Sequence, residues 1–211
     1  MKKVLDTTRF ISFEGIDFSG KTTQIELLHN YLNTKGFQVY ILREPGGTVI
    51  SEKIRDLLLD IKHDNMDSRA EMFLYSAARV QLLTEKIIPL LKKGYFVLAD
   101  RYVDSTTAYQ GYGREIDPGI IKNINRAATF DILPGITFYL EIDPAMASKR
   151  RINSGRSEDR LESAGIEFYR RVFEGYKKIA ADDPDRVKVL DAVLPIDLLH
   201  KLIIKNITLQ K

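Results

Sequence analysis

The segment GIDFSGKTT, residues 15–23, matches the pattern G-x-x-x-x-G-K-[ST] at Gly15, Gly20, Lys21 and Thr22. A strand-like run precedes the segment, and a run with helical spacing follows it. This context is the one that the pattern needs, because N–H groups of such a loop and of the next helix converge on phosphate groups. The segment therefore predicts a triphosphate-binding loop in an α/β protein.

The chemistry of the predicted loop depends on two of its side chains. We expect Lys21 to contact the β- and γ-phosphates of ATP, and the hydroxyl of Thr22 to bind Mg²⁺. The other predicted ATP-binding residues are Gly15, Ile16, Asp17, Phe18, Ser19, Gly20 and Thr23. The alternative is a glycine-rich turn that begins a helix without binding a ligand.

Asp17 is unusual in a loop that surrounds phosphates, because an inward-pointing carboxylate would weaken anion binding. A carboxylate accepts hydrogen bonds, and at a nucleotide site sugar hydroxyls are natural donors. One interpretation is therefore a second nucleotide opposite the ATP. The other is an aspartate that stabilises its own loop by accepting backbone N–H groups.

Strand-like and helical segments alternate along the whole chain of 211 residues. Strands are predicted at 9–14, 38–43, 95–100, 136–142 and 187–191. Helices are predicted at 22–36, 50–60, 71–94, 117–131, 143–151, 161–181 and 195–207, with Pro89 as a potential kink. This alternation predicts an α/β fold with a five-stranded, doubly wound parallel sheet flanked by helices, in a single domain over residues 1–211.

Three motifs follow three of these strands. They are GIDFSGKTT, REPGGT at 43–48 and DRY at 100–102. Ligands of open α/β sheets bind beyond the carboxyl ends of the strands. The motifs are therefore expected to share one edge of the sheet and to form the active site.

Composition argues against several classes of protein. The net charge of +3 is small, so we do not expect nucleic acid binding, and three scattered histidines without any cysteine argue against zinc. No apolar run approaches the roughly 18 residues of a membrane span, and MKKVLDTTRF at residues 1–10 lacks the apolar core of a secretory signal. We expect a cytoplasmic protein that does not bind membranes.

GIDFSGKTT, REPGGT, YSAAR at 75–79 and DRYVDSTTAYQG at 100–111, in this order, resemble the motifs of the thymidylate kinase family. The likeness extends from the first strand to the arginine-rich segment after residue 149. It implies the P-loop NTPase fold of the nucleoside monophosphate kinases, usually as a homodimer. It also implies transfer of the γ-phosphoryl group of ATP to dTMP, giving dTDP and ADP.

The resemblance implies roles for residues outside the phosphate contacts. Asp17 occupies the position that contacts the 3′-hydroxyl of dTMP. Tyr75 matches the aromatic residue that stacks on thymine, and Arg79 matches the arginine that bonds the edge of the base. Arg101 matches the arginine that grips the acceptor phosphate, and Asp100 matches the acid near Mg²⁺.

Four more residues are candidates for the deoxynucleotide pocket. Ser105, Tyr109 and Gln110 fall at family positions that line it, and Tyr109 is the residue associated with excluding a 2′-hydroxyl. Without the motif, Tyr109 would be interpreted as a core aromatic residue. Arg43 could orient the acceptor, although a structural salt bridge with Glu44 or Asp17 is equally credible.

Residues 149–160, KRRINSGRSEDR, contain Arg150, Arg151, Arg156 and Arg160 around a polar turn, which predicts a mobile lid. A bare charge run of this kind is otherwise typical of a solvated helical face. In the family, some members carry a basic residue in the phosphate loop and others supply an arginine from the lid. Phe18 stands where the first group is basic, so this chain resembles the second, with Arg156 or Arg160 expected to join Lys21 and Arg101 in catalysis.

Two other functions stay open at this stage. One is a kinase of the same fold for another nucleotide or for a deoxynucleoside, in which Glu14 or Asp17 would be the only nearby base for a hydroxyl nucleophile. The other is a protein that binds ATP without turnover, which would leave YSAAR and the DRY extension without a purpose.

Overall fold

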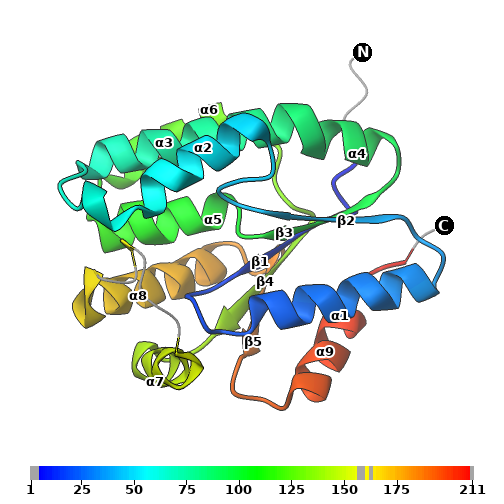
Figure 1. Cartoon of the computed structure of the whole chain (residues 1–211). Coiled ribbons are helices and arrows are strands. Elements are labelled where there is room, and N and C mark those ends of the chain that lie inside the picture. Colours follow the sequence, from blue (N-terminus) through cyan, green and yellow to red (C-terminus); the bar gives the residue numbers. More distant parts are fainter. Residues whose placement is uncertain (1–4, 156–159, 162–163, 210–211) are drawn as a thin grey trace.

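The computed structural model describes residues 5–155, 160–161 and 164–209. Its five strands form one parallel sheet in the order β2-β3-β1-β4-β5 (Figure 1). The strands are β1 (Phe10–Glu14), β2 (Val39–Arg43), β3 (Phe96–Asp100), β4 (Ile136–Glu141) and β5 (Val187–Asp191). The predicted α/β class and the five-stranded parallel sheet are confirmed.

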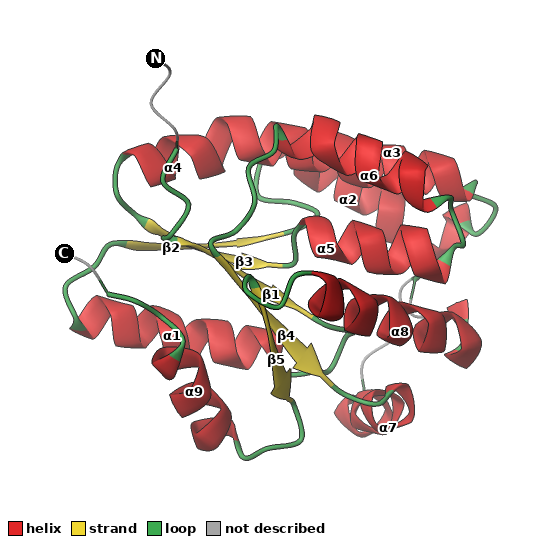
Figure 2. Ribbon diagram, turned by 180° about the vertical axis from the view of Figure 1, so that it is seen from behind, coloured by secondary structure: helices red, strands yellow, loops and turns green. Residues whose placement is uncertain are grey.

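Helices cover both faces of the sheet (Figure 2). In Figure 1, α2, α3, α4 and α6 lie above the sheet, and α1 and α9 lie below it. The long helices are α1 (Lys21–Thr34), α2 (Val49–Leu59), α3 (Ser68–Leu82), α6 (Pro118–Thr129), α7 (Pro144–Ser154), α8 (Ile166–Asp182) and α9 (Ile196–Lys205). The short ones are α4 (Ile88–Lys92), α5 (Val103–Thr106), a 3₁₀ turn (Ile61–His63) and two π-helical turns (Leu83–Ile87 and Thr107–Gly113).

Strand β1 lies at the centre of the sheet, and all five of its residues are buried. Side chains alternate between the two faces of a strand. Ile11 and Phe13 accordingly join the core beneath α1, α8 and α9, whereas Phe10 joins the core beside α3 and α4. Apolar burial on both faces holds β1 in place, and the loop that follows it is therefore held at a defined position.

The long helix expected at 71–94 differs from the structure in two ways. It begins at Ser68, where the carboxylate of Asp67 accepts the N–H groups of Arg69 and Ala70 as a helix cap. Its regular geometry ends at the π turn before Pro89, whose missing N–H leaves the carbonyl of Glu85 without its α-helical donor.

Two further boundaries differ from the expectation. The DRY motif continues into α5 and a π turn over residues 103–113, which were not among the expected helices. Helix α8 begins at Ile166 and not at residue 161, directly after Gly165 with a φ of 85°. The π turn is relevant to function because it carries Tyr109 and Gln110.

Candidate active site

The phosphate loop connects β1 to α1 and requires glycine at its first position. Gly15 has a φ of 130°, and a Cβ atom there would lie 2.6 Å from the carbonyl oxygen of Leu140. Gly20 adopts left-handed geometry at the N-terminus of α1. The loop backbone therefore wraps around the start of α1, as a phosphate site needs.

Lys21 lies at this helix N-terminus with only 6% of its surface exposed. Its ammonium group donates to the carbonyl oxygens of Gly15, at 3.1 Å, and Ile16, at 3.0 Å. Burial lowers the pKa of Lys21, and the nearby Arg101 lowers it further. The loop thus holds a cation in place before any phosphate arrives.

Thr22 and Asp100 come together although they are far apart in the sequence. The hydroxyl of Thr22 donates to Oδ2 of Asp100 at 3.2 Å. Mg²⁺ in nucleotide sites is bound by few protein oxygens, because phosphates and waters complete its shell. One hydroxyl and one carboxylate oxygen beside the loop therefore fit the donors that Mg²⁺ accepts.

Two cavities meet beside the loop. The phosphate-loop cavity, of about 600 Å³, is lined by Asp17, Phe18, Gly20, Lys21, Thr22 and Thr23, together with Arg43, Asp100 and Arg101. The inner cavity is lined by Asp17, Tyr75, Arg101, Ser105, Tyr109 and Gln110. Most residues predicted for ATP thus line the first cavity, most predicted for dTMP line the second, and Asp17 and Arg101 line both.

Arg101 lies at the junction of the two cavities, with a backbone φ of 73°. Its Nη2 donates to Oδ1 of Asp17 at 2.8 Å and to the hydroxyl of Tyr109 at 3.1 Å. Its Nη1 donates to Ser105 Oγ at 3.2 Å and to Tyr176 Oη at 3.3 Å. These contacts hold the guanidinium in one orientation, 4.9 Å from the centre of the Tyr109 ring.

Asp17 lies between two cations. Besides its bond to Arg101, its Oδ1 is 4.0 Å from the ammonium of Lys21. This position removes the apparent conflict with phosphate, because the carboxylate is balanced by positive charge on both sides. About 39% of the side chain is exposed, so it remains accessible from the cavities.

Arg79 is almost fully buried behind the wall of the inner cavity. It donates to Glu44 Oε2 at 2.7 Å, to Thr106 Oγ1 at 2.9 Å and to the carbonyl of Tyr102 at 3.1 Å. Glu44 and Thr106 themselves line that cavity. The structure therefore places Arg79 as a support for the wall, and its contact with thymine stays a prediction.

Arg43 is placed differently from either salt bridge that the sequence suggested. Its Nη2 pairs with Glu52 Oε2 at 3.2 Å, and about half of each side chain is exposed. Glu44, the suggested partner, instead turns into the interior to meet Arg79. Arg43 lines the phosphate-loop cavity.

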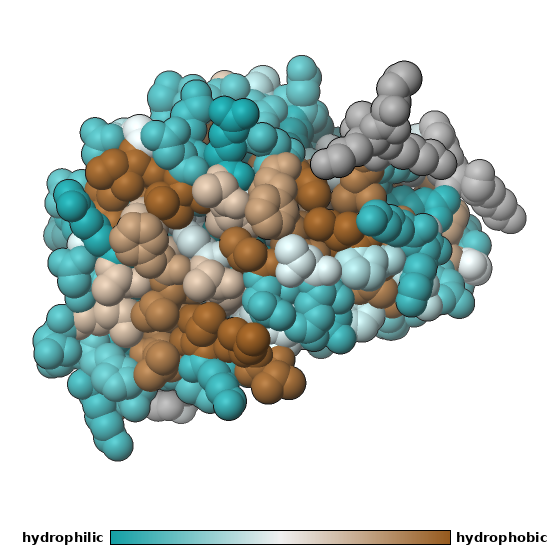
Figure 3. All heavy atoms as spheres, turned by 90° about the horizontal axis from the view of Figure 1, so that it is seen from above, coloured by the Kyte–Doolittle hydropathy of each residue, from teal (hydrophilic) through white to brown (hydrophobic). Residues whose placement is uncertain are grey.

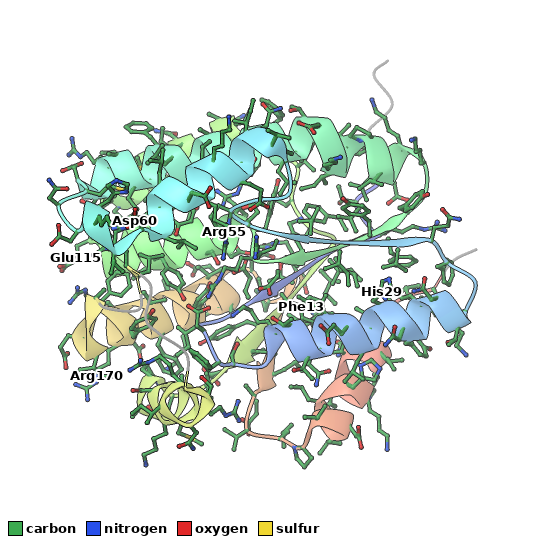
Figure 4. The ribbon with its side chains drawn as sticks, in the orientation of Figure 1. Phe13, His29, Arg55, Asp60, Glu115 and Arg170 are labelled. Carbon is green, nitrogen blue, oxygen red and sulfur yellow. The ribbon has the colours of Figure 1, made fainter. Side chains whose placement is uncertain are left out.

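Sequence reasoning missed Arg55, which lines both cavities. It extends from α2 toward the strands (Figure 4), and its Nη1 donates to the carbonyl oxygen of Pro45 at 3.0 Å. In the sequence, Arg55 is one polar residue in an amphipathic helix. Only the docking of α2 above the strand ends distinguishes it from a solvated arginine.

Sequence reasoning also left Glu14 without a role in the favoured function, although no part of it is exposed. Its Oε1 accepts the backbone N–H of Tyr102 at 2.7 Å. Its Oε2 accepts the hydroxyls of Ser105, at 2.6 Å, and Tyr176, at 2.9 Å. Burial raises the pKa of Glu14 to about 7, and the charge of Asp104 adds to the effect.

The first half of the predicted lid, residues 149–154, is the end of α7, and Gly155 ends that helix with a φ of 67°. Arg150 lines the phosphate-loop cavity and donates to the carbonyls of Phe18, at 3.1 Å, and Ala192, at 2.9 Å. Arg156 lies outside the described residues. An arginine from this segment thus contacts the loop at Phe18, where the sequence indicated a missing cation.

Arg160 is buried against α2 and α3. Its Nη2 donates to Glu71 Oε2 at 2.6 Å, and its Nε donates to the carbonyl of Leu58 at 2.7 Å. Glu71 also accepts bonds from Gln110, at 2.9 Å, and from two nitrogens of Arg114, at 3.0 and 3.2 Å. Burial acts to raise the pKa of Glu71, but these donors together lower it below the ordinary value.

No helix among the residues that the structure describes is long and apolar enough to span a membrane.

Comparison with known proteins identifies the family. The family model described as thymidylate kinase matches residues 13–203. A thymidylate kinase of Caldanaerobacter subterraneus is 43% identical over 199 residues, 94% of each chain, and one of Prosthecochloris aestuarii is 45% identical over 94% of this chain and 92% of its own. The crystal structure of thymidylate kinase from Ehrlichia chaffeensis aligns with a TM-score of 0.77 and 36% identity, covering 95% of this chain and 98% of that one. The chain belongs to the thymidylate kinase family.

Proposed function

We propose that this protein is a dTMP kinase, which transfers the γ-phosphoryl group of ATP to dTMP and releases dTDP and ADP. The main evidence is the pair of adjacent cavities that share Asp17 and Arg101. One cavity opens on the phosphate loop, and the other is lined by residues suited to a deoxynucleotide. Donor and acceptor phosphates would meet where the cavities join.

The transfer needs alignment and positive charge and no general base, because the attacking phosphate oxygen is already ionised. Holding the two phosphates in line contributes several kcal/mol, and fixed cations stabilise the charge of the transition state. Lys21 is the cation on the ATP side and Arg101 the cation on the acceptor side. Mg²⁺, when bound with ATP by Thr22 and Asp100, would neutralise charge on the β- and γ-phosphate oxygens.

The inner cavity is proposed to bind dTMP. Tyr75 would stack on thymine. Arg79 and Gln110 would hydrogen-bond the edge of the base or support the residues that do so. Asp17 would accept a hydrogen bond from the 3′-hydroxyl. Tyr109 supports selection of a deoxyribose, because its ring is nearly fully buried and its hydroxyl is held by Arg101. That ring cannot move aside easily to admit a 2′-hydroxyl.

The acceptor phosphate is proposed to lie between Arg101 and Arg55. Arg55 is added to the predicted set because it lines both cavities. Arg43 would contribute charge to the phosphate-loop cavity from its exposed position. A lid over about 149–160 on the single kinase domain, with Arg156 or Arg160 on the transferring group, remains part of the proposal. Arg160 would first have to leave Glu71 and the carbonyl of Leu58.

We further propose a homodimer in the cytoplasm. Apolar side chains are visible on the face above α2 and α3 (Figure 3). Phe73 of α3 and Leu57 of α2 expose 54% and 47% of their surfaces. An exposed apolar surface on neighbouring helices suits contact with a second copy of the chain. Phe73→Asp should therefore convert a dimer to a monomer. Light scattering measures the molar mass that decides this.

The direct test is ADP release with dTMP, dUMP, dCMP, dGMP and UMP as acceptors. dTMP should give the largest acceleration over the rate with ATP alone. A larger rate with another monophosphate would indicate a kinase with a different acceptor. Tight ATP binding without acceleration by any acceptor would indicate a binding protein and contradict the proposal.

A further inference from the structure

Glu14 is a buried acid next to the proposed site that the transfer reaction itself does not require. It ends β1 directly before the phosphate loop, and none of its surface is exposed. Burying a carboxylate is costly unless donors compensate it. Among the described residues, its hydrogen-bond donors either contact Arg101 themselves or belong to the next residue, Tyr102.

Two hydroxyl groups connect Glu14 to Arg101. Ser105 Oγ lies 2.6 Å from Glu14 Oε2 and 3.2 Å from Arg101 Nη1. Tyr176 Oη lies 2.9 Å from Glu14 Oε2 and 3.3 Å from the same nitrogen of Arg101. Ser105 extends from α5 and Tyr176 from α8, so two elements converge on one carboxylate oxygen.

The direction of these hydrogen bonds follows from the chemistry of the groups. A guanidinium only donates, and an ionised carboxylate only accepts. Each hydroxyl can therefore only accept from Arg101 and only donate to Glu14. Ser105 Oγ and Tyr176 Oη also lie 2.9 Å from each other, where either can be the donor. The ionised form of Glu14 makes both hydroxyls acceptors toward Arg101.

The backbone provides a second connection. Glu14 Oε1 accepts the N–H of Tyr102, the residue that follows Arg101. Arg101 has a φ of 73°, a conformation that costs a non-glycine residue free energy and needs support from its surroundings. The two oxygens of Glu14 thus contact the peptide N–H that follows Arg101 and the two hydroxyls that accept from its side chain.

We propose that Glu14, acting through Ser105 and Tyr176, is a positioning residue that fixes the guanidinium of Arg101 for the acceptor phosphate. The inference rests on the proposed dTMP kinase function. It assigns no direct contact between Glu14 and substrate.

If Glu14 positions Arg101, the rate of phosphoryl transfer should depend on the protonation of Glu14 and so on pH. The charged or titratable groups around Glu14 are Arg101 and Asp104 from the segment after β3, Tyr176 from α8 and Lys21 from α1. Asp104 is itself paired with Arg186. Burial raises the pKa of Glu14 to about 7. Below that pH the protonated acid donates to a hydroxyl, whose own proton must then turn toward the other hydroxyl or toward Arg101. Either change alters the hydrogen bonds that hold the guanidinium.

The first test is Glu14→Gln, which keeps the shape and removes the charge. The amide NH₂ would donate to the two hydroxyls, so the direction of these hydrogen bonds would be reversed at every pH. We expect kcat/KM for dTMP to fall about 10- to 100-fold, with KM for ATP unchanged within about twofold. Glu141→Gln is the matched control, because Glu141 ends the neighbouring strand β4 and lines neither cavity; it should match the unmodified protein.

The pH profile separates positioning from a merely structural role. Activity of the unmodified protein should fall as pH drops through about 7, partly because the dTMP phosphate also takes up a proton near pH 6. That substrate contribution should remain in Glu14→Gln, and the additional loss near pH 7 should vanish. Identical profiles for the two proteins would overturn the inference.

A double-mutant cycle tests the route through the hydroxyls. Ser105→Ala with Tyr176→Phe removes both connections, and adding Glu14→Gln to that background should change kcat/KM by less than about threefold. If Glu14→Gln lowered kcat/KM by the same factor in both backgrounds, the inference would be overturned. Failure of the unmodified protein to phosphorylate dTMP would instead contradict the proposed function, so the two failures are distinguishable.

Discussion

Glu14 and Glu71 are both glutamates without exposed surface, yet their surroundings move their pKa values in opposite directions. Glu14 receives one backbone N–H and two hydroxyls, all uncharged donors, and it lies near Asp104. Glu71 receives bonds from two arginines and an amide. Burial acts to raise the pKa of both acids, and only Glu71 has charged donors, which keep it ionised.

Glu71, whose pKa is lowered, ties α3 to Gln110 and Arg114, in and directly after the π turn that follows α5, and to Arg160, which precedes α8. Its function is to hold the wall of the inner cavity together. Burial raises the pKa of Glu14 to about 7, so its charge beside Arg101 is expected to change within the physiological pH range.

Glu71→Gln should give the largest effect on stability. The substitution leaves Arg114 and Arg160 close together without their shared counter-charge, and breaking a buried ion pair in this way costs about 3–5 kcal/mol. Urea denaturation should therefore show a free energy of unfolding lower by about that amount. Glu167→Gln is the control, because its ion pair with Arg170 is exposed and should contribute under about 1 kcal/mol; an equal loss in both variants would contradict the role of Glu71.

The pH dependence of stability should differ in sign between the two acids. Because the folded pKa of Glu14 is raised to about 7, the folded state binds more protons than the unfolded chain between about pH 4.5 and 7. Stability should therefore fall as pH rises through that range, by up to about 1.4 kcal/mol per pH unit for one group. Glu71, with its lowered pKa, should do the opposite and lose stability only as pH falls below about 4.5.

Thermal unfolding of the unmodified protein and of Glu14→Gln from pH 4.5 to 8 measures this slope. Burial also raises the pKa of Glu44 to about 7, so a part of the slope should persist in the variant. The difference between the two proteins isolates Glu14. A constant difference across the range would show that Glu14 does not titrate there.

Arg160→Ala should lower stability by about 2 kcal/mol, because it removes a charged hydrogen bond to Glu71 and one to the carbonyl of Leu58. Arg156→Ala, in the same predicted lid, should instead lower kcat with little change in stability. Denaturation and steady-state kinetics on both variants check this contrast. A loss of kcat without a loss of stability in Arg160→Ala would assign Arg160 to catalysis and not to Glu71.

Asp17→Asn should give the smallest effect. It removes the charged partner of Arg101 Nη2 but keeps the contacts to Ser105 and Tyr176, so the connection to Glu14 persists. We expect KM for dTMP to rise about tenfold while KM for ATP is spared. Asp182→Asn, in an exposed ion pair with Lys178, is the control; unchanged dTMP affinity in Asp17→Asn would make Asp17 a loop-stabilising residue.

Much of the fold could be predicted from local patterns. The five strands were located within a residue of their ends, because apolar periodicity and the following glycines are encoded over a few residues. The strand-end rule also placed the phosphate loop, REPGGT and DRY at one edge. The helical segment over residues 103–113 was not predicted, because its π turn breaks the 3.6-residue spacing by which helices were recognised.

The sequence was enough to predict a parallel α/β sheet, a triphosphate loop with Lys21 and Thr22, and an unusual carboxylate at Asp17. Which charged groups face one another is visible only in the folded chain. Glu14 meets Tyr176 across 162 residues of sequence, and Arg160 meets Glu71 across 89. The protonation of a buried acid depends on such distant donors and on burial, and neither is encoded in the residues next to it.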